Sequence, residues 1–116
     1  MAILGMDGPY VFTSLEIDRV VTKTSAGNYA LGHSNDTFVV QYVGRSDTDV
    51  NLELKARLNS KYKHFKYSYA TSPKAAFEKE CHNYHDFGGS EKLDNKIHPS
   101  RPAGTSWKCP VCTTFD

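Results

Sequence analysis

Two short motifs in the C-terminal third of the chain contain side chains that bind zinc in proteins. Cys81 and His85 lie four residues apart in a segment with helical features, so both side chains project from one face of the helix. Cys109-Pro110-Val111-Cys112 is a C-x-x-C turn, in which two thiolates can bind one metal ion. The sequence therefore predicts a tetrahedral zinc site with three thiolates and one imidazole, formed by Cys81, His85, Cys109 and Cys112.

The fourth ligand of this site has competitors. His82 and His98 compete with His85, and helical spacing favours His85 because His98 falls in a segment expected to be a loop. The alternative interpretation is a redox C-x-x-C, but such motifs usually open a helix in a βαβ unit, and no such unit is expected here. Four protein ligands leave no open position for water, so we expect a structural zinc that holds the tail on the last helix.

A second group of chemically competent side chains is spread over the middle of the chain. Two tyrosine–glycine motifs fall on neighbouring predicted strands, an arginine falls on the following helix, and a glutamate falls on a later helix. In chain order these features are Gly27-Asn28-Tyr29, Tyr42-Val43-Gly44, Arg57 and Glu80. Their types, order and spacing resemble the GIY-YIG nuclease superfamily from Gly27 to Phe87.

The resemblance implies hydrolysis of a DNA phosphodiester with one divalent metal ion, magnesium or manganese. A phosphodiester is anionic, so its hydrolysis requires groups that neutralise the charge that builds up in the transition state. Glu80 is expected to hold the metal, because magnesium binds through few carboxylates together with water and substrate oxygens. Arg57 is expected to bind the scissile phosphate with two guanidinium N–H groups.

The two tyrosines and Gly44 complete the expected catalytic set. Tyr29 is expected to orient or deprotonate the attacking water, and Tyr42 to support it by hydrogen bonding. A free tyrosine is a poor base at neutral pH, because its pKa is about 10, so a neighbouring cation must activate it. Gly44 is expected to let the end of its strand approach the substrate closely.

Two of these positions have alternatives. The segment from Arg45 to Ala56 is longer than the resemblance leads us to expect before the arginine, so Arg45 is a substitute for Arg57. Glu78 competes with Glu80, which is favoured because members of the family place an alanine four residues before the glutamate, as Ala76 stands here. Additional phosphate contacts are expected from Arg45, Lys61 and His64.

The elements that must position these residues follow from local patterns. His33-Ser34-Asn35-Asp36 separates two apolar runs, which predicts a β-hairpin, and Phe65 to Tyr69 alternates like a third strand. Asp49 or Asn51 can cap a helix carrying Leu54, Leu58 and Tyr62 at four-residue spacing, and Ser72-Pro73 is a typical helix start before a helix that ends near Gly88. Thr13 can cap a short helix to Val21, after a loose lead-in over 1–8.

The predicted fold class is α+β, with a small three-stranded antiparallel sheet flanked by helices and an irregular zinc-bound tail. We divide the chain into an N-terminal lead-in (1–26), a nuclease-like domain (27–87) and a zinc-clipped extension packed on the same domain (88–116). The length of 116 residues allows one domain with a modest core, for which a metal is a natural additional source of stability.

The distribution of charge and the number of cysteines limit the classes of partner and the cellular compartment that we expect. Lys55 to Lys74 contains six basic residues and no acidic one, interleaved with aromatic residues, which is typical of a face that meets a phosphate backbone and equally of a solvated surface. An odd number of cysteines argues against a closed disulfide framework, and neither a signal peptide nor a membrane span is evident, so we expect a cytoplasmic protein.

Together these observations predict a metal-dependent DNA endonuclease, a hydrolase whose partner is DNA and not a membrane. A homodimer or a protein partner for targeting stays open. The alternative function is a catalytically inactive, zinc-stabilised module that binds nucleic acid or another protein.

Overall fold

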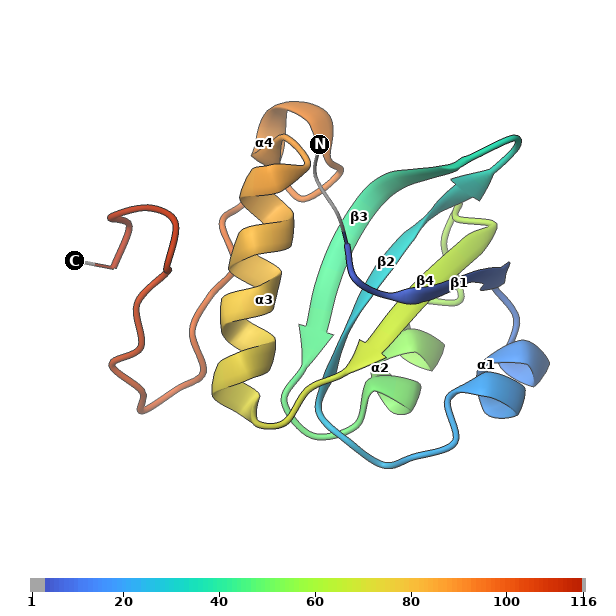
Figure 1. Ribbon diagram of the computed structural model, residues 1–116, viewed down its shortest axis with the longest axis horizontal. Helices are drawn as coiled ribbons and strands as arrows, with labels where there is room; N and C mark the ends of the chain where they lie inside the picture. The colour runs from blue at the N-terminus through green and yellow to red at the C-terminus, as the bar shows by residue number, and fades with distance from the viewer. Residues whose placement is uncertain (1–3, 116) are drawn as a thin grey trace.

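The protein folds around a four-stranded antiparallel sheet with the strand order β1-β4-β2-β3. The computed structural model describes residues 4–115 (Figure 1). The strands are β1 (Asp7–Val11), β2 (Gly27–Ser34), β3 (Phe38–Ser46) and β4 (His64–Tyr69). The helices are α1 (Ser14–Val20), α2 (Val50–Ala56), α3 (Pro73–Asp86) and α4 (Gly89–Lys92). The α+β prediction is therefore confirmed, with one strand more than expected.

The predicted hairpin is formed by β2 and β3, which carry both tyrosine–glycine motifs. β2 pairs with β3 over its whole length, and the register sets Tyr29 opposite Gly44 and Asn28 opposite Arg45. Because successive side chains alternate between the faces of a strand, Tyr29 and Gly44 share one face, and Asn28 and Arg45 share the other. β3 is an edge strand, so groups from both faces can meet beyond its free side.

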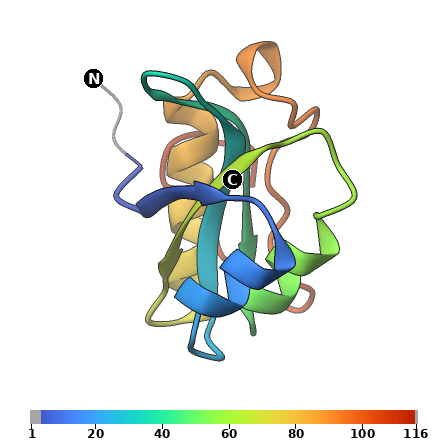
Figure 2. The ribbon, with the colours of Figure 1, turned by 90° about the vertical axis from the view of Figure 1, so that its right-hand side faces the viewer.

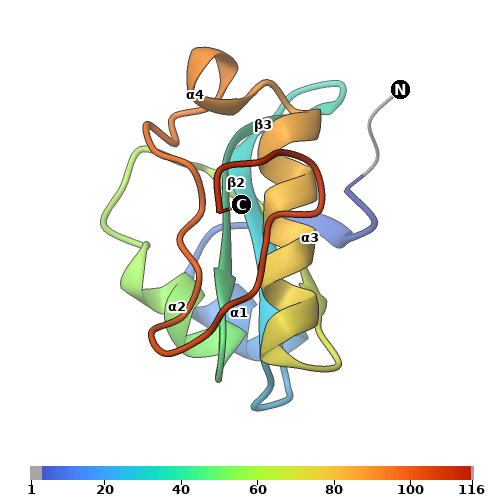
Figure 3. The same ribbon diagram turned by 90° about the vertical axis from the view of Figure 1, so that its left-hand side faces the viewer.

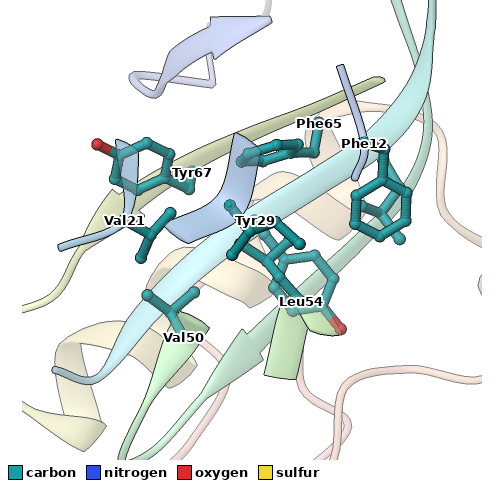
Figure 4. Packing of buried hydrophobic residues seen from close by; sticks show 9 residues of the cluster. Phe12, Val21, Tyr29, Val50, Leu54, Phe65 and Tyr67 are labelled. Carbon is teal, nitrogen blue, oxygen red and sulfur yellow. The ribbon is translucent and has the colours of Figure 1, made fainter. Parts of the chain in front are cut away.

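One face of the sheet is covered by α1 and α2, which lie side by side (Figure 2). Thr13 and Asp49 cap these helices by accepting hydrogen bonds from backbone N–H groups of the first turn. Figure 4 shows the core beneath them, where Tyr29 and Phe65 of the sheet pack against Val50 and Leu54 of α2. Complete burial of these side chains gives α2 a fixed position beside β2 and β3.

The other face of the sheet is covered by α3. Its predicted start is confirmed, because the Ser72 hydroxyl accepts a hydrogen bond from the Ala75 N–H and proline follows the cap. The Asn28 side chain donates to the Ala76 carbonyl at 2.9 Å and is fully buried, which ties β2 directly to this helix. Glu80 follows one helical turn after Ala76 on α3.

The C-terminal tail packs on α3 and on the free edge of β3. Figure 3 shows the chain running from α4 down beside α3 toward α2 before it returns across α3. The Asn95 side chain accepts from the Val43 N–H at 3.0 Å and donates to the Val43 carbonyl at 2.8 Å, so it occupies both edge groups of that residue. On α3 the tail adds Trp107 and Cys109 to an apolar cluster with Phe77 and Cys81.

Several elements differ from the predicted ones. The segment expected to be a lead-in contains β1, an edge strand whose Tyr10 packs against Phe65 and Tyr67 of the sheet. Proline at position 9 obscured this strand, although an edge strand tolerates a residue that cannot donate a ladder hydrogen bond. α2 ends at Ala56, so Leu58 and Tyr62 lie beyond it, and α4 was not predicted.

Among residues 4–115, none of the helices has the length and apolar character that crossing a bilayer demands.

Candidate active-site cleft and metal-ligand cluster

A cleft of about 340 Å³ lies where β2, β3, α2, α3 and the tail meet. It brings together all five residues predicted to be catalytic, together with Arg45: its lining includes Tyr29, Tyr42, Gly44, Arg45, Arg57 and Glu80. Asp47, Glu53, Asn95 and residues 97–100 of the tail complete the walls. The predicted phosphate contacts Lys61 and His64 are not among the lining residues. Lys61 instead pairs with Asp94, and His64 accepts a hydrogen bond from the Ser34 N–H.

Tyr29 reaches the cleft from the middle of the core. Its ring is 1% exposed, and its hydroxyl donates to Glu53 Oε2 at 3.1 Å. Burial raises the pKa of Tyr29 well above its ordinary value, and the Glu53 carboxylate raises it further against the opposing effect of Arg57. Tyr29 is therefore a neutral hydrogen-bond donor in this structure, which favours the predicted orienting role over deprotonation of water.

Gly44 provides the space that Tyr29 needs. A Cβ atom at Gly44 would lie 2.3 Å from Cζ of Tyr29 and 2.4 Å from its hydroxyl oxygen. The close approach expected at Gly44 is thus an approach of the Tyr29 ring, which passes over the glycine toward the cleft. Tyr42 stacks on the same ring, with centroids 6.3 Å apart, and burial raises the pKa of its hydroxyl.

Arg57 stands at the C-cap of α2, where its side chain remains 45% exposed. Its guanidinium lies 5.4 Å from the centroid of the Tyr42 ring and 3.2 Å from Glu53 Oε2. Glu53 therefore holds both the Tyr29 hydroxyl and Arg57. Glu53 was not among the predicted site residues, although its position one helical turn before Arg57 is the usual spacing of a helical ion pair.

Arg45 and Glu80 form an ion pair on the opposite wall. Arg45 Nη1 lies 2.5 Å from Glu80 Oε1, and both side chains are 11% exposed. Burial raises the pKa of Glu80, and the Arg45 guanidinium opposes that shift. Arg45 also bonds Asp47 at 2.9 Å and lies over the Phe77 ring, so it is held from three sides.

The lining carries more negative than positive charge. Two guanidinium groups, Arg45 and Arg57, face three carboxylates, Asp47, Glu53 and Glu80, which gives a formal charge of −1 when His98 is neutral. A phosphate that entered this cleft alone would meet net repulsion. One divalent cation would reverse the sign to +1, and carboxylate oxygens are the ligands that magnesium prefers.

A metal-ligand cluster lies directly behind the tail residues that line the cleft. His85, His98, Cys109 and Cys112 could hold a metal ion such as zinc, since their ligand atoms all lie within 4.8 Å of one another. The two imidazole Nε2 atoms are 3.1 Å apart, and Cys112 Sγ lies 3.3 Å from His98 Nε2. Tetrahedral zinc places its ligand atoms roughly 3.4–3.8 Å apart, so small shifts suffice for coordination.

This cluster differs from the predicted ligand set at one position, where His98 replaces Cys81. Cys81 is fully buried beside Cys109 in the apolar cluster on α3, and burial raises the pKa of its thiol. The His98 ring is oriented for a metal, because its Nδ1 lies 2.8 Å from the Pro99 carbonyl and leaves Nε2 facing the cluster. His82 is exposed on α3 and lies outside the cluster, whereas His85 belongs to it as predicted.

Comparison of the chain with protein-family models, curated proteins and solved structures found no match.

Proposed function

We propose that the cleft is the active site of a divalent-metal-dependent DNA endonuclease of the GIY-YIG type. The observation that carries the proposal is the meeting of Tyr29, Arg57 and Glu80, from three separate elements, in one negatively lined cleft. The mixture of guanidinium, carboxylate and tyrosine groups suits an anionic substrate that arrives with a cation.

We assign the lining residues to two groups: Glu80 and Arg57 would act on the phosphate, and Tyr29 and Glu53 on the attacking water. A divalent ion bound at Glu80 would supply positive charge to the phosphate oxygens as the transition state forms. Arg57 is exposed enough to exchange its contact with Glu53 for a bidentate contact with the scissile phosphate. The Tyr29 hydroxyl and the Glu53 carboxylate then stand together at the position for the attacking water, with Tyr29 orienting it and Glu53 accepting its proton.

We further propose that the His85, His98, Cys109 and Cys112 cluster binds zinc as a structural ion. All four positions are filled by protein, the thiolates and imidazoles are typical zinc ligands, and no open coordination site remains. Free cysteines that serve as metal ligands fit a reducing compartment, so we propose a cytoplasmic location.

Replacement of Tyr29 with phenylalanine tests the proposed role of the Tyr29 hydroxyl. Loss of the hydroxyl is expected to lower the single-turnover rate of cleavage of a DNA duplex in magnesium by about 100-fold, the lower range for loss of one preorganised hydrogen-bond donor in an active site. Tyr67→Phe is the matched control, because it removes a partly buried tyrosine hydroxyl that donates to the Val20 carbonyl at 2.9 Å. Tyr67 is not among the residues that line the cleft. Equal rates for the two variants would contradict the role of Tyr29.

A catalytically inactive DNA-binding module is the second candidate function. The buried ion pair between Arg45 and Glu80 favours it, because the carboxylate already has a protein partner that would explain its presence without a metal. This candidate predicts DNA binding that weakens steeply with salt, with no cleavage in magnesium or manganese. Measurement of binding and cleavage on one duplex separates the two functions.

A further inference from the structure

His98 belongs to two sites at once. Its ring nitrogen Nε2 faces the metal-ligand cluster, while the residue also lines the cleft with its neighbours Ile97, Pro99 and Ser100. We call residues 97–100 the tail wall. No other cluster residue lines the cleft, so His98 is the structural link between the two sites.

The tail wall depends on few other contacts. No backbone hydrogen bond is described between residues 95–100 and the sheet or the helices. The Asn95 side chain anchors the start of the segment to Val43, and the His98 ring anchors its middle. Ile97 is 79% exposed and Ser100 is exposed, so within the wall only Pro99 and the His98 ring, which packs on Tyr84 and Phe115, are packed against the rest of the chain.

We propose that a zinc ion bound by His85, His98, Cys109 and Cys112 holds the tail wall in place and thereby completes the DNA-binding cleft. The zinc does not contact the substrate; His98 is a positioning residue that transmits its coordination to the wall. The effect on DNA rests on the proposed function of the cleft, whereas the effect on the wall does not. Removal of the metal frees the middle of the segment while Asn95 still holds its start.

The physical basis is the local stability of the segment. A region with few buried apolar contacts and few backbone hydrogen bonds opens at low free-energy cost, unless another bond restrains it. Zinc coordination fixes the His98 ring, and the ring's Nδ1 contact with the Pro99 carbonyl passes that restraint to the backbone. The two bonds on one imidazole therefore join the metal to the wall.

The test is the NMR order parameter S² of the Ile97 and Ser100 backbone amides, measured in the zinc-loaded and zinc-depleted full chain. We expect depletion to lower S² at these amides from about 0.85, the value of rigid backbone, to below about 0.6, while the central strand amides of Ala30 and Leu31 stay rigid. Affinity for a short DNA duplex, measured in calcium to prevent turnover, should fall in parallel. Unchanged S² at Ile97 and Ser100 after zinc loss would overturn the proposal, as would an equal fall at Ala30.

A second test uses variants at His98. His98→Ala is expected to behave like the zinc-depleted protein, and His98→Cys, which restores a zinc ligand, should recover both the zinc content and the order parameters of the wall. His82→Ala is the matched control, because His82 is exposed on the same helix as His85 and lies outside the cluster. Native order parameters at Ile97 and Ser100 in His98→Ala would contradict the proposal.

The two proposals fail separately. If the native chain binds no DNA and cuts none, but zinc still controls the order parameters of Ile97 and Ser100, the effect of zinc on the wall stands and the function fails. If the native chain cuts DNA but these order parameters do not depend on zinc, the function stands and the wall inference fails.

Discussion

Replacement of Glu80 with glutamine is expected to lower the rate of DNA cleavage in magnesium by about 1,000-fold, which corresponds to the several kcal/mol that a catalytic metal contributes to the transition state. Glutamine keeps an oxygen that can accept from Arg45 but lacks the charge that binds a divalent ion. The measurement is the single-turnover cleavage rate of a labelled duplex over a range of magnesium concentrations.

The same variant should retain its fold and bind DNA at least as well as the native chain. The formal charge of the cleft lining rises from −1 to 0 when Glu80 becomes neutral, which reduces repulsion of the phosphate backbone. Glu78→Gln is the matched control, since Glu78 lies on the same helix outside the cleft. A Glu80→Gln protein that cuts as fast as Glu78→Gln would exclude Glu80 as the metal ligand.

The second large effect is expected at the metal-ligand cluster. The double variant Cys109→Ser with Cys112→Ser should contain no zinc and should unfold more easily, because a ligand that binds only the folded state stabilises it. At free zinc about 100 to 1,000 times the dissociation constant, the loss is about 3–4 kcal/mol in the free energy of unfolding. That corresponds to a fall of about 10–20 °C in the thermal midpoint.

Zinc content and thermal unfolding of each variant, with and without added zinc, check this expectation. Cys81→Ala is the informative comparison, because Cys81 contacts the apolar cluster but lies outside the ligand set. It should lose some packing energy yet keep one zinc ion. Loss of zinc from Cys81→Ala would instead support the ligand set predicted from the sequence, with Cys81 in place of His98.

The metal-ligand cluster contains His98 where the sequence predicted Cys81, because local sequence patterns do not determine how the tail packs on α3. Helical spacing correctly relates Cys81 to His85, since residues four apart share a helix face. However, Cys81 lies on the buried side of α3 and packs in the apolar cluster with Phe77. His98 lies in an irregular segment with no periodicity, so its place beside His85 follows from tertiary packing of the tail alone.

The elements behind the cleft were more predictable than its chemistry. Turn residues between apolar runs indicated the hairpin that sets Tyr29 opposite Gly44, and the Ser72-Pro73 cap indicated the start of α3. The contact of Glu53 with Tyr29 depends on how α2 packs on the sheet, and the Asn95 contact with Val43 on how the tail meets an edge strand. Neither arrangement has a local sequence signal strong enough to predict it.

The structure also changes the chemical description of Tyr29. The expected activation by a cation requires a lowered pKa, whereas burial and Glu53 raise the pKa of this tyrosine. We therefore propose that Glu53, which accepts the hydrogen bond of the Tyr29 hydroxyl, takes the proton-accepting role in place of Tyr29. Arg57, which contacts Glu53 in this structure, would leave it when a phosphate binds and so free the carboxylate for the water.

Conversion of supercoiled plasmid to nicked circles by the zinc-loaded native chain tests directly whether the cleft is a nuclease site. We expect nicking that requires magnesium or manganese, stops with excess chelator, and is absent from the Glu80→Gln protein purified in the same way. If the native chain binds the plasmid in magnesium and manganese at protein excess but leaves it supercoiled, the cleft is not a nuclease site.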